Sequence, residues 1–295
     1  MKSEVWRRFV ICLPYVWLGL FFLLPFLIVF KISFSDPIVG QPPYTAFFDW
    51  SASGFEKLKA TLDNFLFLFE DDLYYTSYLK SLRIASTATI LCLLLGYPMA
   101  YGIARTRQPY RNLLLLLIVL PFWTSFLLRV YAWMTMLGTY GIINNILIFL
   151  GLTDEPLKLL YTDLAVYIGI VYSYLPFMVL PLYVALERLD LDLHDAAADL
   201  GARPTRVFFD VTLPLSVPGI IGGCLLVFIP TLGEFVIPSL LGGADSLMIG
   251  RVLFDEFFTN RDWPLASAVA TVLLLLLVLP MMLFQRSQVR GADLS

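Results

Sequence analysis

The defining stretch of this chain reads Asp195-Ala196-Ala197-Ala198-Asp199-Leu200-Gly201 and, nine residues later, Val211-Thr212-Leu213-Pro214. It lies between two long apolar segments, and its charged side chains keep it out of lipid. Small alanines in a short helix, a glycine at the bend and a closing Leu-Pro favour a hairpin that presses into a groove on a partner. The sequence therefore predicts a polar connection, residues 187–215, that leaves the membrane to meet another protein.

The composition around this stretch is that of a membrane protein. Of 295 residues, 59% are hydrophobic and 15% are charged, against about 45–50% and about 25% in soluble domains. A spanning helix needs about 20 mostly apolar residues. Six segments meet this requirement: 9–33, 80–104, 112–137, 162–186, 216–241 and 263–284. We therefore expect an all-α membrane protein, a six-helix bundle with residues 1–295 as a single transmembrane domain.

The first apolar segment follows Lys2, Arg7 and Arg8, so a cleaved signal peptide is an alternative reading. Its apolar run exceeds the 7–15 residues of a signal peptide. The sequence Lys31-Ile32-Ser33-Phe34 is also a poor cleavage context. The segment is therefore predicted to remain as a spanning helix.

The orientation follows from lysines and arginines near the helix ends. The short connection after the second span carries Arg105, Arg107 and Arg111 and no acid, which places it in the cytoplasm. Both termini then become cytoplasmic, and so does the 187–215 connection with Arg188, Arg203 and Arg206. The predicted hairpin lies on the side of the membrane that holds ATP.

Two external connections are expected to be structured. Residues 34–79 are rich in Phe, Tyr and Trp, which favours short interfacial helices. This connection is either a lid over the bundle or a contact surface for an external solute-binding protein, and both readings stay open. In the connection 138–161, the apolar run from Ile142 to Leu152 is too short to span and predicts a surface or re-entrant helix.

Glu234 is the carboxylate set well inside a predicted span, between Pro230 and Pro238. A charge at bilayer depth costs about 2.5–3.5 kcal/mol on insertion scales, and such residues usually face a cavity or a partner. One reading is a site for a passing cation. The other is an ion pair or hydrogen bond to a neighbouring helix, with Arg129 as the candidate partner.

Aromatic residues accompany these charges. At helical spacing, one face of the third span carries Phe122, Phe126, Arg129 and Trp133. Tyr167, Tyr172 and Tyr174 enter the fourth span before Pro176. A tyrosine-rich wall with isolated acids suits an organic polyamine, because methylenes prefer apolar contact and ammonium groups prefer π faces or carboxylates. The candidate substrate pathway is Glu234, Trp123, Tyr131 and Tyr174. Ordinary packing is the alternative for the aromatic residues.

Several function classes lack their motifs. The chain has no G-x-x-x-x-G-K-[ST] for ATP, no H-E-x-x-H and no G-x-S-x-G. Cys12, Cys92 and Cys224 have no metal spacing, and His194 is the single histidine. A net charge of −3 gives no sign of nucleic-acid binding. We expect a transport subunit rather than an enzyme, without a metal, a cofactor of its own or a nucleic-acid partner.

The polar stretch resembles the EAA loop of ABC importer permeases, which reads Glu-Ala-Ala, three residues, Gly, nine residues, Ile, one residue, Leu-Pro. Here Asp195 stands for the glutamate and Val211 for the isoleucine. Other segments resemble bacterial polyamine permeases, with the closest likeness to putrescine permeases: Pro42–Thr45, Ser125–Trp133, Gly233–Pro238 and Glu256–Pro264. The resemblance covers nearly the whole chain.

This resemblance implies a type I (MetI-like) importer of the inner membrane that works by alternating access. A second, homologous permease would complete the pathway, two ATPase subunits would hold ATP and Mg, and a periplasmic protein would deliver the polyamine. The coupling residues would be Asp195, Ala196, Ala197, Gly201, Leu213 and Pro214. Spermidine or another solute is the alternative cargo, and a passive channel or carrier is the alternative class.

Overall fold

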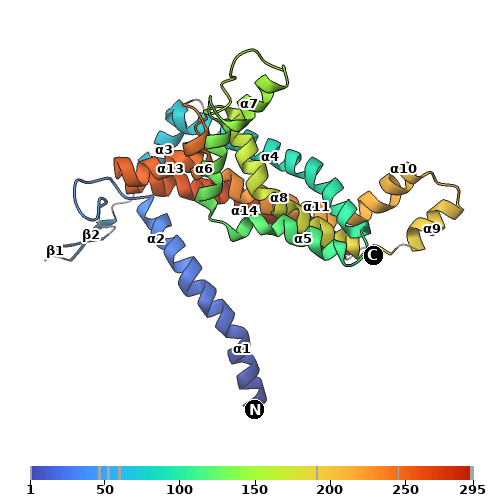
Figure 1. The fold of residues 1–295 in the computed structure, drawn as a ribbon. Coiled ribbons are helices and arrows are strands. Elements are labelled where there is room, and N and C mark those ends of the chain that lie inside the picture. Colours follow the sequence, from blue (N-terminus) through green and yellow to red (C-terminus); the bar gives the residue numbers. More distant parts are fainter. Residues whose placement is uncertain are drawn as a thin grey trace. The chain divides into compact units, whose positions relative to one another are not determined.

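A computed structural model describes residues 2–45, 48–51, 54–58, 61–190, 192–244 and 246–292. The chain divides into two compact units, Met1–Thr76 with Val252–Ser295, and Ser77–Arg251. Within the described residues the regular structure is helical apart from one two-stranded hairpin (Figure 1).

The first unit begins with one long helix, formed by α1 (Lys2–Leu18), the π-helical turn η1 (Gly19–Leu23) and α2 (Leu24–Ile32). Its most apolar part, Val10–Ile32, is long enough to cross a membrane. Large apolar side chains along it, such as Trp17 and Phe22, are exposed within the chain. Such a surface belongs in lipid or against another protein.

The connection after α2 contains the antiparallel strands β1 (Phe48–Ser51) and β2 (Gly54–Leu58), then α3 (Asp63–Glu70). Helix α3 confirms the expectation of a short helix here, whereas the hairpin was not expected. The Asn64 side-chain amide fixes α3 to the end of α2 by donating to the carbonyls of Ser33 (3.0 Å) and Ser35 (2.8 Å).

The rest of the first unit contains the end of α13 (Ile249–Phe254, which begins in the second unit), η4 (Asp255–Asn260) and α14 (Trp263–Ala292). Buried Glu256 in η4 accepts hydrogen bonds from the Tyr74 hydroxyl (2.8 Å) and the Asn260 amide (2.9 Å). The Phe257 and Trp263 rings stack with centroids 5.0 Å apart. These contacts hold the turn that precedes α14.

The second unit contains most of the helices. In chain order they are α4 (Asp72–Arg105, which begins in the first unit), α5 (Tyr110–Val119), η2 (Leu120–Trp123), α6 (Phe126–Leu137), α7 (Ile142–Phe149), α8 (Asp163–Glu187), α9 (Asp192–Asp199), α10 (Pro204–Val207), η3 (Phe208–Thr212), α11 (Leu213–Leu232), α12 (Val236–Leu241) and α13 (Ile249–Phe254).

Helices α8 and α11 pack against each other at close range. A Cβ at Gly219 would lie 2.5 Å from the Ala185 Cβ, and one at Gly223 would lie 2.7 Å from the Met178 sulfur. Small residues are typical of such contacts, because helices in lipid associate through close packing rather than through the hydrophobic effect. The α8–α11 pair therefore forms the frame of the second unit.

Two of the predicted spans are interrupted in the structure. The segment 112–137 is divided, because η2 ends at Trp123, Thr124 is extended and α6 begins at Phe126. The segment 216–241 is divided between Leu232 and Val236. Among the described residues, the stretches long and apolar enough to cross a membrane are Val10–Ile32, Asp72–Arg105, Phe126–Phe149, Asp163–Glu187 and Pro204–Leu232, with shorter apolar helices at Tyr110–Trp123 and Trp263–Val278.

The connection between α6 and α8 is organised around one buried amide. The Asn144 Nδ2 donates to the carbonyls of Gly138 (3.2 Å), Thr139 (3.2 Å) and Leu157 (2.9 Å), and its Oδ1 accepts from the Leu157 N–H (3.0 Å). Asn144 belongs to α7, the short helix expected within 142–152. The amide thus ties both ends of this connection to one side chain.

Candidate functional site

Glu234 lies in the break between α11 and α12, and its side chain is 8% exposed. Its Oε1 accepts the backbone N–H groups of Val236 (3.0 Å) and Ile237 (3.4 Å) at the start of α12. A carboxylate suits this position because the first N–H groups of a helix lack partners within the helix. Its Oε2 accepts a hydrogen bond from the hydroxyl of Tyr174, which lies in α8.

A cavity of about 360 Å³ opens beside this carboxylate. The residues that line it include five aromatic rings, one acid and one arginine, and they are Phe122, Phe126, Arg129, Ser173, Tyr174, Phe177, Pro230, Gly233, Glu234, Phe235 and Val236. The structure thus brings together Tyr174 of α8, Arg129 of α6 and Glu234 of the break between α11 and α12. This combination offers a cation both a carboxylate and π faces.

The guanidinium group of Arg129 lies over aromatic rings and makes no ion pair with Glu234. Its guanidinium carbon lies 5.1 Å from the Phe122 ring centroid and 5.8 Å from that of Phe126. Its Nε is shielded from solvent and has no hydrogen-bond partner. The ion pairs Lys80–Asp163, Arg111–Glu187 and Arg206–Asp210 do not involve Arg129, and within the described residues no ion pair joins it to Glu234.

Trp123 and Tyr131 lie away from the cavity lining. Trp123 is 75% exposed and Tyr131 is 50% exposed. The Trp133 ring, expected on the same face as Arg129, packs on Tyr172 with centroids 5.5 Å apart. Of the four proposed pathway residues, the cavity therefore contains Glu234 and Tyr174.

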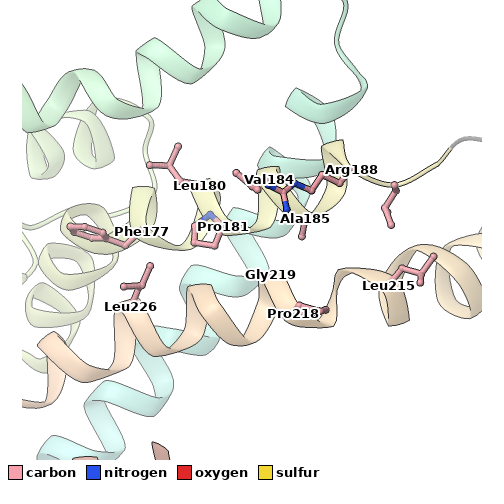
Figure 2. A pocket seen from close by; sticks show the side chains of 11 residues that line it. Phe177, Leu180, Pro181, Val184, Ala185, Arg188, Leu215, Pro218, Gly219 and Leu226 are labelled. Carbon is pink, nitrogen blue, oxygen red and sulfur yellow. The ribbon is translucent and has the colours of Figure 1, made fainter. Parts of the chain in front are cut away.

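A second hollow of about 700 Å³ runs along the α8–α11 pair. Figure 2 shows residues that line it, among them Leu180 and Val184 on α8, Arg188 at the end of that helix, and Leu215 and Leu226 on α11. Phe177 lines both this groove and the Glu234 cavity. Sequence reasoning missed the groove, although Phe177, Leu180, Val184 and Arg188 recur at helical spacing and trace one face.

The predicted coupling stretch forms a helical hairpin of α9 and α10 (Figure 1). At the end of α9, the Gly201 N–H donates to the Ala198 carbonyl (2.8 Å) and the Ala202 N–H to the Ala197 carbonyl (3.1 Å). This pattern is a Schellman motif, which needs a left-handed residue, and Gly201 has φ +80°. A Cβ there would meet nothing within 4 Å, so backbone conformation rather than space favours glycine.

The hairpin presents small and apolar side chains outward. Asp195, Ala196 and Gly201 are exposed, and Leu200 is 90% exposed. No residue of α9 within its described range is buried in this chain. A surface of this kind is available to a partner protein.

His194 fixes the base of the hairpin. Its Nε2 lies 3.0 Å from an Arg105 guanidinium nitrogen and 2.9 Å from the Thr212 hydroxyl. Because a guanidinium only donates, Nε2 accepts that hydrogen bond. Leu213 and Pro214, which follow, start α11, so the hairpin continues directly into the helix that ends at Leu232. Among the described residues, no three His, Cys, Asp or Glu side chains gather as a metal site.

Comparison with known proteins agrees with these features. A family model described as "Binding-protein-dependent transport system inner membrane component" matches residues 3–293. The spermidine/putrescine transport system permease protein PotB of Haemophilus influenzae is 42% identical over 285 residues, 97% of this chain and 95% of that protein. PotB of Escherichia coli is 42% identical over 271 residues, 92% of this chain and 94% of that protein.

A solved structure supports the same fold. The structure of a bacterial ABC transporter that imports the acidic polysaccharide alginate matches with a TM-score of 0.66 at 19% identity, covering 96% of each chain. At this identity the match concerns the fold alone. Together, these comparisons confirm the resemblance to polyamine ABC importer permeases and the helical, MetI-like membrane fold.

Proposed function

Because the chain belongs to the family of binding-protein-dependent transport system inner membrane components, we propose that it is the permease subunit of an ATP-driven importer of polyamines, with putrescine as the preferred cargo. Its relatives at 42% identity are named for spermidine and putrescine transport, which supports the polyamine class. The chain moves solute, and a separate subunit hydrolyses ATP.

The observation that carries this proposal is the cavity at Glu234. A diamine has ammonium ends that favour carboxylates and π faces, and methylenes that favour apolar contact. In the cavity, Glu234 can bind an ammonium group. The rings of Phe122, Phe126 and Phe177 can bind both ammonium groups and methylenes. Tyr174 holds the carboxylate in place through its hydroxyl. This lining suits an organic cation better than an anion or a neutral sugar.

The connection between hairpin and cavity suggests how ATP hydrolysis is coupled to transport. From Pro204 to Leu232 the chain is one helical stretch of 29 residues, or roughly 40 Å at 1.5 Å per residue. The hairpin lies at one end, and Gly233 and Glu234 follow the other end. An ATPase that moves the hairpin therefore moves the wall of the cavity, which is the requirement for alternating access.

The remaining parts of the importer follow from this role. A second, homologous permease completes the pathway, two ATPase subunits with ATP and Mg hold the hairpins, and a periplasmic polyamine-binding protein delivers the cargo. The chain crosses the inner membrane several times, with both termini in the cytoplasm and Arg105, Arg107 and Arg111 on that side. The ATPase supplies the difference in binding free energy that a change of conformation requires.

Two alternatives make different predictions. A permease for spermidine or another solute would keep the hairpin and the coupling but change the cargo. A passive channel or carrier would need no ATPase. The exposed hairpin with Leu200 90% exposed favours the driven importer, because a passive protein gains nothing from such a surface.

The test is uptake of labelled putrescine, with spermidine as competitor, into proteoliposomes that hold this chain with its partner subunits. We expect uptake that requires both ATP and the binding protein. Stronger inhibition by spermidine than by unlabelled putrescine would assign spermidine as the preferred cargo. Uptake that continues without ATP would support a passive carrier, and ATP hydrolysis without polyamine uptake would point to another solute.

A further inference from the structure

Arg129 is a cation without an anion inside a cavity that we assign to cations. Its guanidinium lies over the Phe122 and Phe126 rings, at 5.1 Å and 5.8 Å from their centroids. No ion pair of the described residues includes it, and its shielded Nε has no hydrogen-bond partner. The negatively polarised faces of these two rings are therefore the groups that stabilise the positive charge of Arg129.

Glu234 does not neutralise this charge, although both side chains line the same cavity. The Glu234 oxygens are taken by the Tyr174 hydroxyl and by the N–H groups of Val236 and Ile237. The cavity thus keeps an acid and a base that are not paired with each other. An arginine that lines the same cavity as a buried acid is expected to pair with it when its role is only structural.

We propose that Arg129 is a tethered cation that excludes small cations from the pathway and yields its aromatic site to the ammonium group of the cargo. A fixed positive charge raises the free energy of a second cation in a low-dielectric cavity, and a pore arginine can exclude cations in this way. Cation–π attraction holds the guanidinium on the rings. The inference rests on the proposed function, since it assumes that the Glu234 cavity lies on the pathway.

The cargo overcomes this exclusion because it interacts with more of the cavity. One ammonium group can take the place of the guanidinium on Phe122 and Phe126, and the methylenes contact Phe177. A potassium ion has no methylenes and loses its hydration shell without replacing those contacts. Arg129 is thus a specificity-determining residue, with selectivity arising from what it repels.

The experiment measures leak rather than uptake. The complete importer is reconstituted without binding protein, with and without ATP, and efflux of potassium and methylammonium is recorded. Arg129→Met removes the charge and keeps an unbranched apolar side chain, so the leak of both ions should rise by roughly tenfold or more. Arg129→Lys keeps a charge that can lie over the rings, and its leak should stay near that of the wild type.

A double substitution separates gating from loosened packing. In Arg129→Met with Glu234→Gln the attracting carboxylate is lost as well, so the extra leak should fall back. A leak in Arg129→Met equal to the wild type, in a complex that still hydrolyses ATP, overturns the proposal. An equal leak in Arg129→Lys and Arg129→Met also overturns it, because the charge would then be irrelevant.

Two safeguards keep the outcome decisive. If the Arg129→Met complex does not assemble, Arg129→Gln carries the same test with a planar, uncharged head group. The leak assay contains no polyamine. A failure of the wild type to take up putrescine in the separate uptake assay would therefore refute the cargo assignment, and the leak assay would still decide the role of Arg129.

Discussion

Two buried glutamates, one in each unit, look alike at first and differ in their surroundings. Glu234 and Glu256 are both 8% exposed. Glu234 accepts a hydrogen bond from the Tyr174 hydroxyl, and Glu256 accepts one from the Tyr74 hydroxyl. Glu256 takes its second bond from the Asn260 amide four residues on. Glu234 instead binds the N–H groups of the next helix and borders a cavity of about 360 Å³.

Burial and a tyrosine partner are therefore not enough to mark a binding site. Both features describe a carboxylate whose hydrogen bonds are satisfied, as buried polar groups generally require. What makes Glu234 a candidate site is the cavity of about 360 Å³ beside it, whose rings can accept a cation. Substitutions of the two acids and of their tyrosine partners test whether the acids differ in function as they differ in surroundings, and two glycine substitutions test the elements that support the Glu234 cavity.

The largest effect is expected from Glu234→Gln. Gln keeps the shape and an acceptor but loses the charge, and interactions with a charged partner are worth about 1.5–3 kcal/mol. Polyamine uptake at low substrate should fall about 10- to 100-fold, with normal amounts of assembled complex. The matched control is Glu256→Gln, for which uptake should stay within about twofold. Equal losses of uptake in both variants would remove the distinction between the two acids.

Gly219→Ala tests whether the α8–α11 frame holds Tyr174 and Glu234 together. The new Cβ would lie 2.5 Å from the Ala185 Cβ and 2.9 Å from the Pro181 carbonyl oxygen. Overpacking of this kind costs about 1–3 kcal/mol, so the apparent melting temperature of the purified complex should fall by several degrees. In Gly222→Ala the nearest atom is the Pro181 Cβ at 3.8 Å, and no such fall is expected.

Gly201→Ala separates the cavity from the hairpin. At φ +80° an alanine costs about 1–2 kcal/mol, which distorts the hairpin and leaves Glu234 untouched. ATP hydrolysis should persist while uptake per ATP falls about fivefold or more, measured together in proteoliposomes. Gly201→Asn should retain most of the coupling, because asparagine tolerates the left-handed conformation. Full coupling in the alanine variant would contradict the assigned role of the hairpin.

The smallest effect is expected from the two tyrosines. Tyr174→Phe and Tyr74→Phe each remove one hydrogen bond to a glutamate, worth about 0.5–1.5 kcal/mol. Tyr174→Phe should raise the KM for polyamine about threefold, since Glu234 loses its fixed position. Tyr74→Phe should lower thermal stability slightly and leave KM unchanged. A shift of KM in Tyr74→Phe alone would place the binding site at Glu256 instead.

Most of the spanning helices and part of the candidate site could be predicted from the sequence, because the lengths of apolar runs and the positions of isolated charges can be read without a structure. Long apolar runs predict spanning helices, and an acid such as Glu234 within one predicts a polar environment. The neighbourhood of Phe126 and Arg129 within α6 also followed from helical spacing, whereas Phe122 reaches the same cavity from η2, on the other side of the break at Thr124. The hairpin at Gly201 was expected because a glycine after a short alanine helix is a common helix end.

The rest depended on tertiary structure. The break at Thr124 interrupts the third apolar segment, so a single helical phase does not extend from Trp123 to Tyr131. The groove at Phe177 is lined by side chains of both α8 and α11, so neither helix reveals it by itself. The strands at 48–51 and 54–58 lie in an irregular connection where local signals were weak.

The buried amide of Asn144 affects the rate at which another protein would associate with the connection after α6. Because this one side chain satisfies three carbonyls and an N–H, the connection after α6 has a defined shape before anything touches it. Ordering an interface costs about 0.5–1.5 kcal/mol for each side chain immobilised on binding. A protein that docks on this connection meets a preformed surface, so its association rate is limited by diffusion and orientation rather than by folding of the loop.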